Sequence, residues 1–296
     1  MARRCGQSLP PPAASSASTR AVMAYYLTTI LLLAAVPALW LHRCFALGLL
    51  AAAAVVALLV GRLEVVGALA MLGCAVLSQM LGRSPKGWVG WAAWAAVLGS
   101  AALLYLHVAP GFPAWTVMGP VRIGEGTPYE KLLAFDKTGA GILLLALAVP
   151  GILSRSRWGP LLRRAAPILV LTPLLLSLIA VASGYADWDV TVTQAFLWWG
   201  ILNLLTTCVS EEALFRGLLQ TRLVAAAAQH GWPAHLAILL TALVFGLAHA
   251  AGGLVLVLLA TLAGIGYGCA YHATRRIEAA ILCHFIVNAG HFLLLT

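Results

Sequence analysis

Long apolar runs separated by short polar or Gly/Pro-containing segments form the dominant pattern of this chain. A helix needs about 20 consecutive apolar residues to cross the hydrocarbon core of a bilayer. The pattern therefore predicts an all-α fold, a polytopic transmembrane helix bundle of about 8–10 helices. The runs lie at roughly 21–40, 45–60, 64–82, 88–109, 139–153, 165–184, 190–209, 234–251, 253–273 and 277–295. Of these, 45–60 and 139–153 are the shortest and the least suited to a full span.

The segments that interrupt this pattern suggest how the chain is organised. Residues 1–20 are polar and contain three consecutive prolines, which predicts a disordered tail. Residues 21–138 are expected to hold N-terminal transmembrane helices and an extramembrane loop. The loop at 110–138 has glycines and prolines in its first half, which argue against a regular element there and favour a re-entrant or surface segment. Residues 139–296 are expected to form a C-terminal transmembrane region.

Composition and charge support a membrane protein and exclude other classes. The chain is 62% hydrophobic and only 9% charged, whereas soluble domains contain about 25% charged residues. Its net charge of +9 comes from basic residues scattered between apolar runs, a pattern of topology signals rather than of nucleic-acid binding. The six cysteines have no paired spacing and are expected to be free thiols. An arginine-rich, lysine-poor and alanine-rich composition indicates a bacterial source. Together with the apolar runs, it predicts a multi-pass protein of a bacterial inner membrane, in contact with the lipid bilayer.

A cluster of ionisable residues lies inside one of the apolar segments. Glu211, Glu212 and Arg216 occur within six residues, although each charge at membrane depth costs about 2.5–3.5 kcal/mol on insertion scales. Glu212 and Arg216 are i and i+4, so they share a helix face and can neutralise one another. Glu211 points about 100° away and lacks that partner. We therefore expect Glu212 to be structural and Glu211 to be available for chemistry, with a helix break near Glu211 because 190–222 is too long for one span.

Two further polar pairs occur in the last third of the chain. Phe245 and His249 form one i, i+4 pair, and His284 and Asn288 form another. Counting about 1.5 Å per residue from the helix ends brings both pairs to the depth of Glu211, near the middle of the bilayer. Lipid offers no hydrogen bonds, so polar groups at this depth must be enclosed by helices. The active site is therefore expected inside the bundle.

These residue types form a set suited to amide hydrolysis. A carboxylate in a low-dielectric pocket can act as a general base on water. A histidine beside it can hold that water, and a second histidine with an amide can donate hydrogen bonds to a developing oxyanion. Such a set needs neither a covalent nucleophile nor a cofactor.

The motifs EExxxR, FxxxH and HxxxN, in this order, resemble those of the CAAX prenyl endopeptidase and bacteriocin-processing (CPBP, or Abi) family of intramembrane proteases. The resemblance covers a core at about residues 195–292. It implies a glutamate-type endopeptidase acting on membrane-bound proteins or peptides, without a cofactor. The residues implied are Glu211 and His249 for water activation, His284 and Asn288 for the oxyanion site, and Glu212 and Arg216 as supporting residues.

Other functions are compatible with parts of this pattern. Glu211 could cap a helix, and a lone His249 or His284 is commonly an interhelical packing residue. Glutamate and histidine could bind Zn²⁺, although HExxH is absent and Arg216 is an unfavourable neighbour for a cation. A proton-coupled transporter could use the same groups, but the chain shows no two-half symmetry. A non-catalytic immunity protein is a third alternative. Substrate and oligomeric state are left open by the sequence.

Overall fold

The computed structural model describes residues 16–83, 86–121, 129–149, 151, 153 and 158–295. Almost all regular structure in these ranges is helical, which confirms the predicted helix bundle. The helices that precede the polar motifs are α1 (Ser16–Leu41), α2 (Arg43–Leu59), α3 (Val65–Gly82), α4 (Gly87–Tyr105), α5 (Phe135–Leu143) with η1 (Leu144–Ala148), and α6 (Trp158–Ala182). Those that follow are α7 (Ala195–Leu202), η3 (Asn203–Cys208), α8 (Val209–Glu212), η4 (Ala213–Gln220), α9 (Thr221–Gln229), α10 (Ala234–Leu247), η5 (Ala250–Gly252), α11 (Gly253–Thr274) and α12 (Ile277–Leu294).

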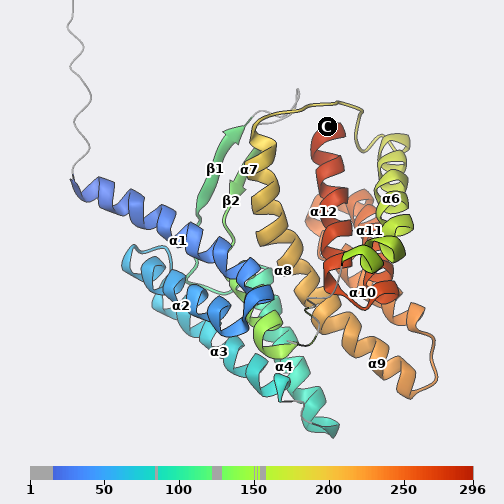
Figure 1. The fold of residues 1–296 in the computed structure, drawn as a ribbon, viewed down its shortest axis with the longest axis horizontal. Coiled ribbons are helices and arrows are strands. Elements are labelled where there is room, and N and C mark those ends of the chain that lie inside the picture. Colours follow the sequence, from blue (N-terminus) through green and yellow to red (C-terminus); the bar gives the residue numbers. More distant parts are fainter. Residues whose placement is uncertain are drawn as a thin grey trace, which may run out of the picture.

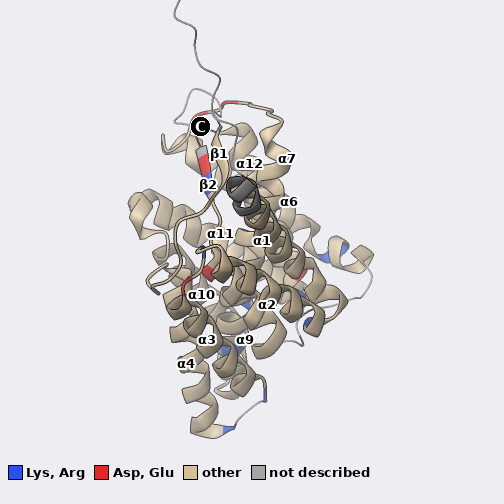
Figure 2. Cartoon of the chain, turned by 90° about the vertical axis from the view of Figure 1, so that its left-hand side faces the viewer, with Lys and Arg blue, Asp and Glu red and all other residues tan. Residues whose placement is uncertain are grey.

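Helix length and composition establish an integral membrane protein. Among the described residues, six helical segments are long and apolar enough to cross a bilayer: Val22–Leu41, Val65–Gly82, Gly87–Tyr105, Trp158–Ala182, Ala250–Thr274 and Ile277–Leu294. Many large apolar side chains on these helices face outward. Figure 2 shows that Lys, Arg, Asp and Glu are sparse along the helices. Such an exterior suits contact with lipid rather than with water. The five described cysteines are free thiols.

The helices form two groups on either side of one long helical segment (Figure 1). Helices α1–α5 pack together on one side, and α6, α10, α11 and α12 pack together on the other. The segment from α7 to α9 runs between them and contacts both groups. It carries Glu211 and Glu212, so both groups reach the polar cluster.

The predicted helix break near Glu211 is wrong. Residues Ala195–Gln229 are helical throughout, and π-helical turns, η3 and η4, lie immediately before and after α8. A π-turn inserts an extra residue into the helix and occurs frequently at functional sites. The wider turns leave Glu211 and Glu212 on an unbroken, buried helix instead of at a helix end.

The connection between α4 and α5 contains more regular structure than its glycines and prolines predict. Strand β1 (Thr116–Val121) pairs antiparallel with β2 (Tyr129–Leu132), although β1 contains Gly119 and Pro120. The register shifts twice along the pair, as expected where proline cannot donate to the ladder. The expectation of no regular element in this half of the loop is therefore wrong. At the N-terminus, α1 begins at Ser16 rather than after the predicted tail, the rest of which lies outside the described residues.

Helix α5 packs closely against the segment that carries the glutamates. A Cβ atom at Gly141 would lie 2.8 Å from both Cα and Oγ of Ser210. The Tyr105 hydroxyl on α4 donates to the Ser210 carbonyl, and Trp94 Nε1 donates to the Leu218 carbonyl at 3.2 Å. The N-terminal helices thereby fix the position of the residue next to Glu211.

Gly141→Ala is expected to destabilise the protein by about 1–3 kcal/mol, because the added methyl group overlaps backbone atoms that cannot move independently. Thermal unfolding in detergent, followed by circular dichroism, measures the loss. Gly48→Ala on α2 is the matched control, since a methyl group added there would have no neighbouring atom within 4 Å. Equal melting temperatures for the two variants would contradict the close contact.

Candidate active site

The first and third polar motifs meet at Glu212. Its Oε1 atom accepts a hydrogen bond from Arg216 Nη1 at 3.1 Å and lies 2.8 Å from His284 Nδ1. A carboxylate accepts hydrogen bonds and does not donate them. His284 therefore carries a proton on Nδ1, and its second nitrogen, Nε2, lies 3.8 Å from Glu211 Oε2. The His284 ring thus separates the two carboxylates.

Arg216 is fully buried and contacts the same Glu212 oxygen as His284. Its Nη2 atom donates to the Gly264 carbonyl on α11 at 2.7 Å. The guanidinium also lies 5.0 Å from the centroid of Phe245 and 5.2 Å from that of Tyr267. Aromatic faces attract cations, and this attraction grows when water is excluded. The structure therefore brings Glu212 and Arg216 together as the i, i+4 spacing predicts.

Aromatic rings fix the orientation of His284. Tyr267 stacks on the imidazole with a centroid distance of 4.6 Å and an interplanar angle of 13°. Phe245 approaches the same ring edge-on, at 5.9 Å and 88°. The hydrogen bond to Glu212 and these two contacts together define which way Nε2 points.

His249 lies on the other side of Phe245. Its Nδ1 atom is 2.8 Å from the Phe245 carbonyl oxygen, which can only accept, so Nδ1 carries the proton here as well. The Phe245 ring lies 4.8 Å from the His249 ring. Phe245, the first residue of the second motif, therefore orients His249 and leaves its Nε2 atom for other contacts.

Asn288 has a partner that the sequence did not indicate. Its Nδ2 atom donates to Asn203 Oδ1 on η3 at 3.2 Å. Cys208 Sγ donates to the same oxygen at 3.2 Å. Asn288 Nδ2 also donates to Cys208 Sγ at 3.9 Å, a long and weak contact. Asn203 is one of two amides in the apolar run at 190–209, the other being Gln194, and this placement was the available signal for it.

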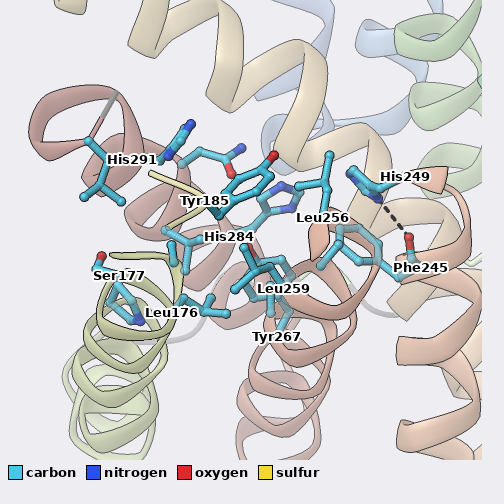
Figure 3. A pocket seen from close by; sticks show the side chains of 17 residues that line it. Leu176, Ser177, Tyr185, Phe245, His249, Leu256, Leu259, Tyr267, His284 and His291 are labelled. Carbon is cyan, nitrogen blue, oxygen red and sulfur yellow. Dashed lines mark hydrogen bonds between the residues drawn. The ribbon is translucent and has the colours of Figure 1, made fainter. Parts of the chain in front are cut away.

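His249, His284 and Asn288 line one cavity of about 200 Å³ (Figure 3). Apolar side chains of α6 and α11, such as Leu176 and Leu259, form much of its remaining wall. Glu211 is not part of this wall and lies behind His284, on the side of α5. Three of the sequence-predicted residues thus line this cavity, and Glu211 is connected to it through His284.

Glu211, which was predicted to lack Arg216 as a partner, has a different cationic partner on α5. Lys137 Nζ lies 2.5 Å from Glu211 Oε1, and the two side chains are only 18% and 10% exposed. The lysine belongs to the first turn of α5, directly after the polar loop. The sequence gives no direct signal for the contact, because 74 residues separate the two partners.

A second cavity, of about 600 Å³, lies on the far side of Lys137. It is lined by residues of the segment 107–115, by β2 and the start of α5, and by Thr206 and Thr207 of η3. Lys131 donates to Thr207 Oγ1 at 2.9 Å. Burial, and then the nearby Lys137 ammonium, lower the pKa of Lys131 from its usual value. Lys137, Glu211 and His284 therefore form a polar connection between the two cavities.

The described part of the chain contains no group of three His, Cys, Asp or Glu side chains placed to share a metal ion. Catalytic zinc sites usually use three protein ligands and one water. The side chains near Glu211 are instead paired with lysine, arginine and one another.

Comparison with known proteins gives one family match. Residues 193–290 match the family model described as type II CAAX prenyl endopeptidase Rce1-like. Helices α1–α6, and with them Lys137, lie outside the matched residues. No significant match was found among curated proteins or among solved structures.

Proposed function

We propose that this membrane protein, which belongs through residues 193–290 to the type II CAAX prenyl endopeptidase Rce1-like family, hydrolyses peptide bonds of membrane-associated proteins or peptides by activating water with Glu211. The observation that carries the proposal is the position of His284. Its Nδ1 atom is held by Glu212 at 2.8 Å, and its Nε2 atom lies 3.8 Å from Glu211 Oε2 at the edge of an apolar cavity.

Water activation is assigned to Glu211 and His284. Their facing atoms are too far apart for a direct hydrogen bond, and close enough for one water molecule to contact both. Glu211 Oε2 has no hydrogen-bond partner among the described residues. In the proposed step, Glu211 removes a proton from water and the hydroxide adds to the peptide carbonyl carbon. When the C–N bond breaks, Glu211 returns the proton to the leaving nitrogen.

Oxyanion stabilisation is assigned to Asn288 and His249, which line the same cavity as His284. Asn288 donates to Asn203 and, over a long distance, to Cys208 Sγ, and a substrate oxygen can replace the sulfur as acceptor. His249 can donate through Nε2 in its protonated form, because Nδ1 is held by the Phe245 carbonyl. This assignment exchanges the histidine roles that the family resemblance implies, since His284 is the histidine within 4 Å of Glu211. Glu212 and Arg216 keep the supporting role.

Asn288→Ala is expected to lower peptide hydrolysis by about 10²-fold, the loss typical of removing one oxyanion donor. The rate is measured with purified protein in liposomes. Gln79→Ala, which removes an exposed amide on α3, is the control and should keep the native rate. A proton-coupled transporter would tolerate loss of the amide, so unchanged activity of Asn288→Ala would count against the hydrolase.

The function itself is tested with the purified native protein in liposomes. Membrane proteins extracted from cells carrying Glu211→Gln serve as the substrate pool, and mass spectrometry maps new peptide ends. The proposal predicts new ends, with or without a strong chelator. Ends that disappear with the chelator would support the zinc-dependent variant. Proton flux without new ends would support a transporter, and neither activity from folded protein would support a non-catalytic role.

A further inference from the structure

We propose that Lys137 is a positioning residue of this active site: its ammonium group keeps the Glu211 carboxylate ionised and directs Oε2 toward His284. The inference rests on the proposed function, in which Glu211 is the general base. Lys137 belongs to the N-terminal helices, outside the family-matched residues 193–290. The inference therefore gives these helices a role in positioning Glu211.

The two oxygens of Glu211 have different surroundings. Oε1 is 2.5 Å from Lys137 Nζ. Oε2 has no hydrogen-bond partner within the described ranges and faces His284 Nε2. One strong charge-assisted contact on Oε1 fixes the plane of the carboxylate. The other oxygen is thereby presented to the histidine that lines the cavity.

The other cations near Glu211 are engaged elsewhere. Arg216 binds Glu212 and the Gly264 carbonyl, and Lys131 donates to Thr207. In the described chain, Lys137 is thus the one lysine or arginine in ion-pair contact with Glu211. The titratable and charged groups that face Glu211 are Lys137 on α5, His284 on α12, His249 after α10, Glu212 on α8, Tyr105 on α4, Cys208 on η3 and Lys131 on β2.

The position of Lys137 is fixed by several contacts of α5. Asp136 Oδ1 accepts the Lys137 backbone N–H at 2.8 Å, and Asp136 Oδ2 lies 2.8 Å from His107 Nδ1. Four residues further on, Gly141 lies against Ser210, the residue before Glu211. These contacts hold the start of α5 beside α8, so Lys137 contacts Glu211 from a helix whose position is fixed by packing.

The pair has a direct electrostatic consequence. Burial alone favours the neutral form of a carboxylic acid, whereas an adjacent ammonium favours the carboxylate. A neutral Glu211 could not accept a proton from water. Lys137 therefore matters most at acidic and neutral pH, where an unpaired buried glutamate would be protonated.

Infrared difference spectroscopy of the full-length protein in liposomes tests this inference without a substrate. Protonated carboxyl and carboxylate groups absorb differently, and Glu211→Gln identifies the Glu211 band. In Lys137→Met, the midpoint of that band should move up by about 1–3 pH units, the usual effect of one close opposite charge. Lys137→Arg should stay near the native midpoint, and Lys131→Met should move it much less. A Lys137→Met midpoint equal to the native one would overturn the inference.

Two further outcomes keep the inference separate from the proposed function. A shifted band with no peptidase activity in the native protein would support the lysine's electrostatic role and contradict the hydrolase. If Lys137→Met fails to fold, adding Glu211→Gln should restore folding, because no uncompensated buried charge remains. Failure of the double variant to fold would overturn the inference. Higher peptidase activity in Lys137→Met would also overturn it, since the ion pair would then be inhibitory.

Discussion

Glu211→Gln is expected to remove peptide hydrolysis almost completely, with a rate loss of about 10²–10⁴-fold, the range typical of a general base. Glutamine has nearly the same shape as glutamate, and its carbonyl oxygen can still accept from Lys137. It cannot take a proton from water. The loss should therefore appear in the rate of peptide cleavage by purified protein, while circular dichroism and elution volume in detergent stay native.

Glu278→Gln is the matched control for this substitution. Glu278 is also a buried carboxylate, on α12, and its Oε1 atom accepts from Trp40 Nε1 at 2.8 Å. It lies away from the cavity that His249 and His284 line. Its glutamine variant should therefore keep peptidase activity even where stability falls. Similar rate losses for the two variants would mean that the effect of Glu211→Gln is structural.

Arg216→Met is expected to destabilise the protein by about 3–5 kcal/mol, the cost of leaving one partner of a buried ion pair uncompensated. Both partners, Arg216 and Glu212, have fully buried side chains. Methionine fills similar space but cannot bind Glu212 or donate to the Gly264 carbonyl. Chemical or thermal unfolding in detergent, compared with the native protein, measures the loss.

The double variant Glu212→Gln/Arg216→Met should recover part of this stability, because it removes the unpaired charge. Arg222→Met, one turn and a half further along, is the control for loss of an arginine. That guanidinium is only partly buried and stacks on Trp91 at 4.2 Å from the ring centroid. Its loss should cost far less. Native-like melting of Arg216→Met would contradict a structural role for the buried pair.

The sequence predicted those features that depend on local periodicity. Apolar runs predicted a helix bundle, and the structure confirms it. The i, i+4 spacing predicted the contact between Glu212 and Arg216, because helix geometry brings such residues to one face. The three motifs also predicted the family resemblance, which the family-model match of residues 193–290 supports. The catalytic roles remain predictions.

Features that depend on packing between distant segments were not predictable in this way. The contact of Lys137 with Glu211 requires α5 to lie against α8, and the bond between Asn288 and Asn203 requires α12 to lie against η3. The spacing of residues along the sequence does not indicate which helices pack against each other. The unbroken helix through Glu211 was missed for a related reason. The π-turns and the helices that pack on both sides of this segment allow it to be longer than a single isolated membrane span.

The measurement that tests the central claim most directly compares peptide ends in cells that carry the native protein or Glu211→Gln. Mass spectrometry of membrane and secreted peptides would record the new termini in each. The hydrolase predicts at least one peptide end that appears only with the native protein, and that end identifies a substrate. Identical termini, with both proteins folded and present at equal levels, would contradict proteolysis by Glu211.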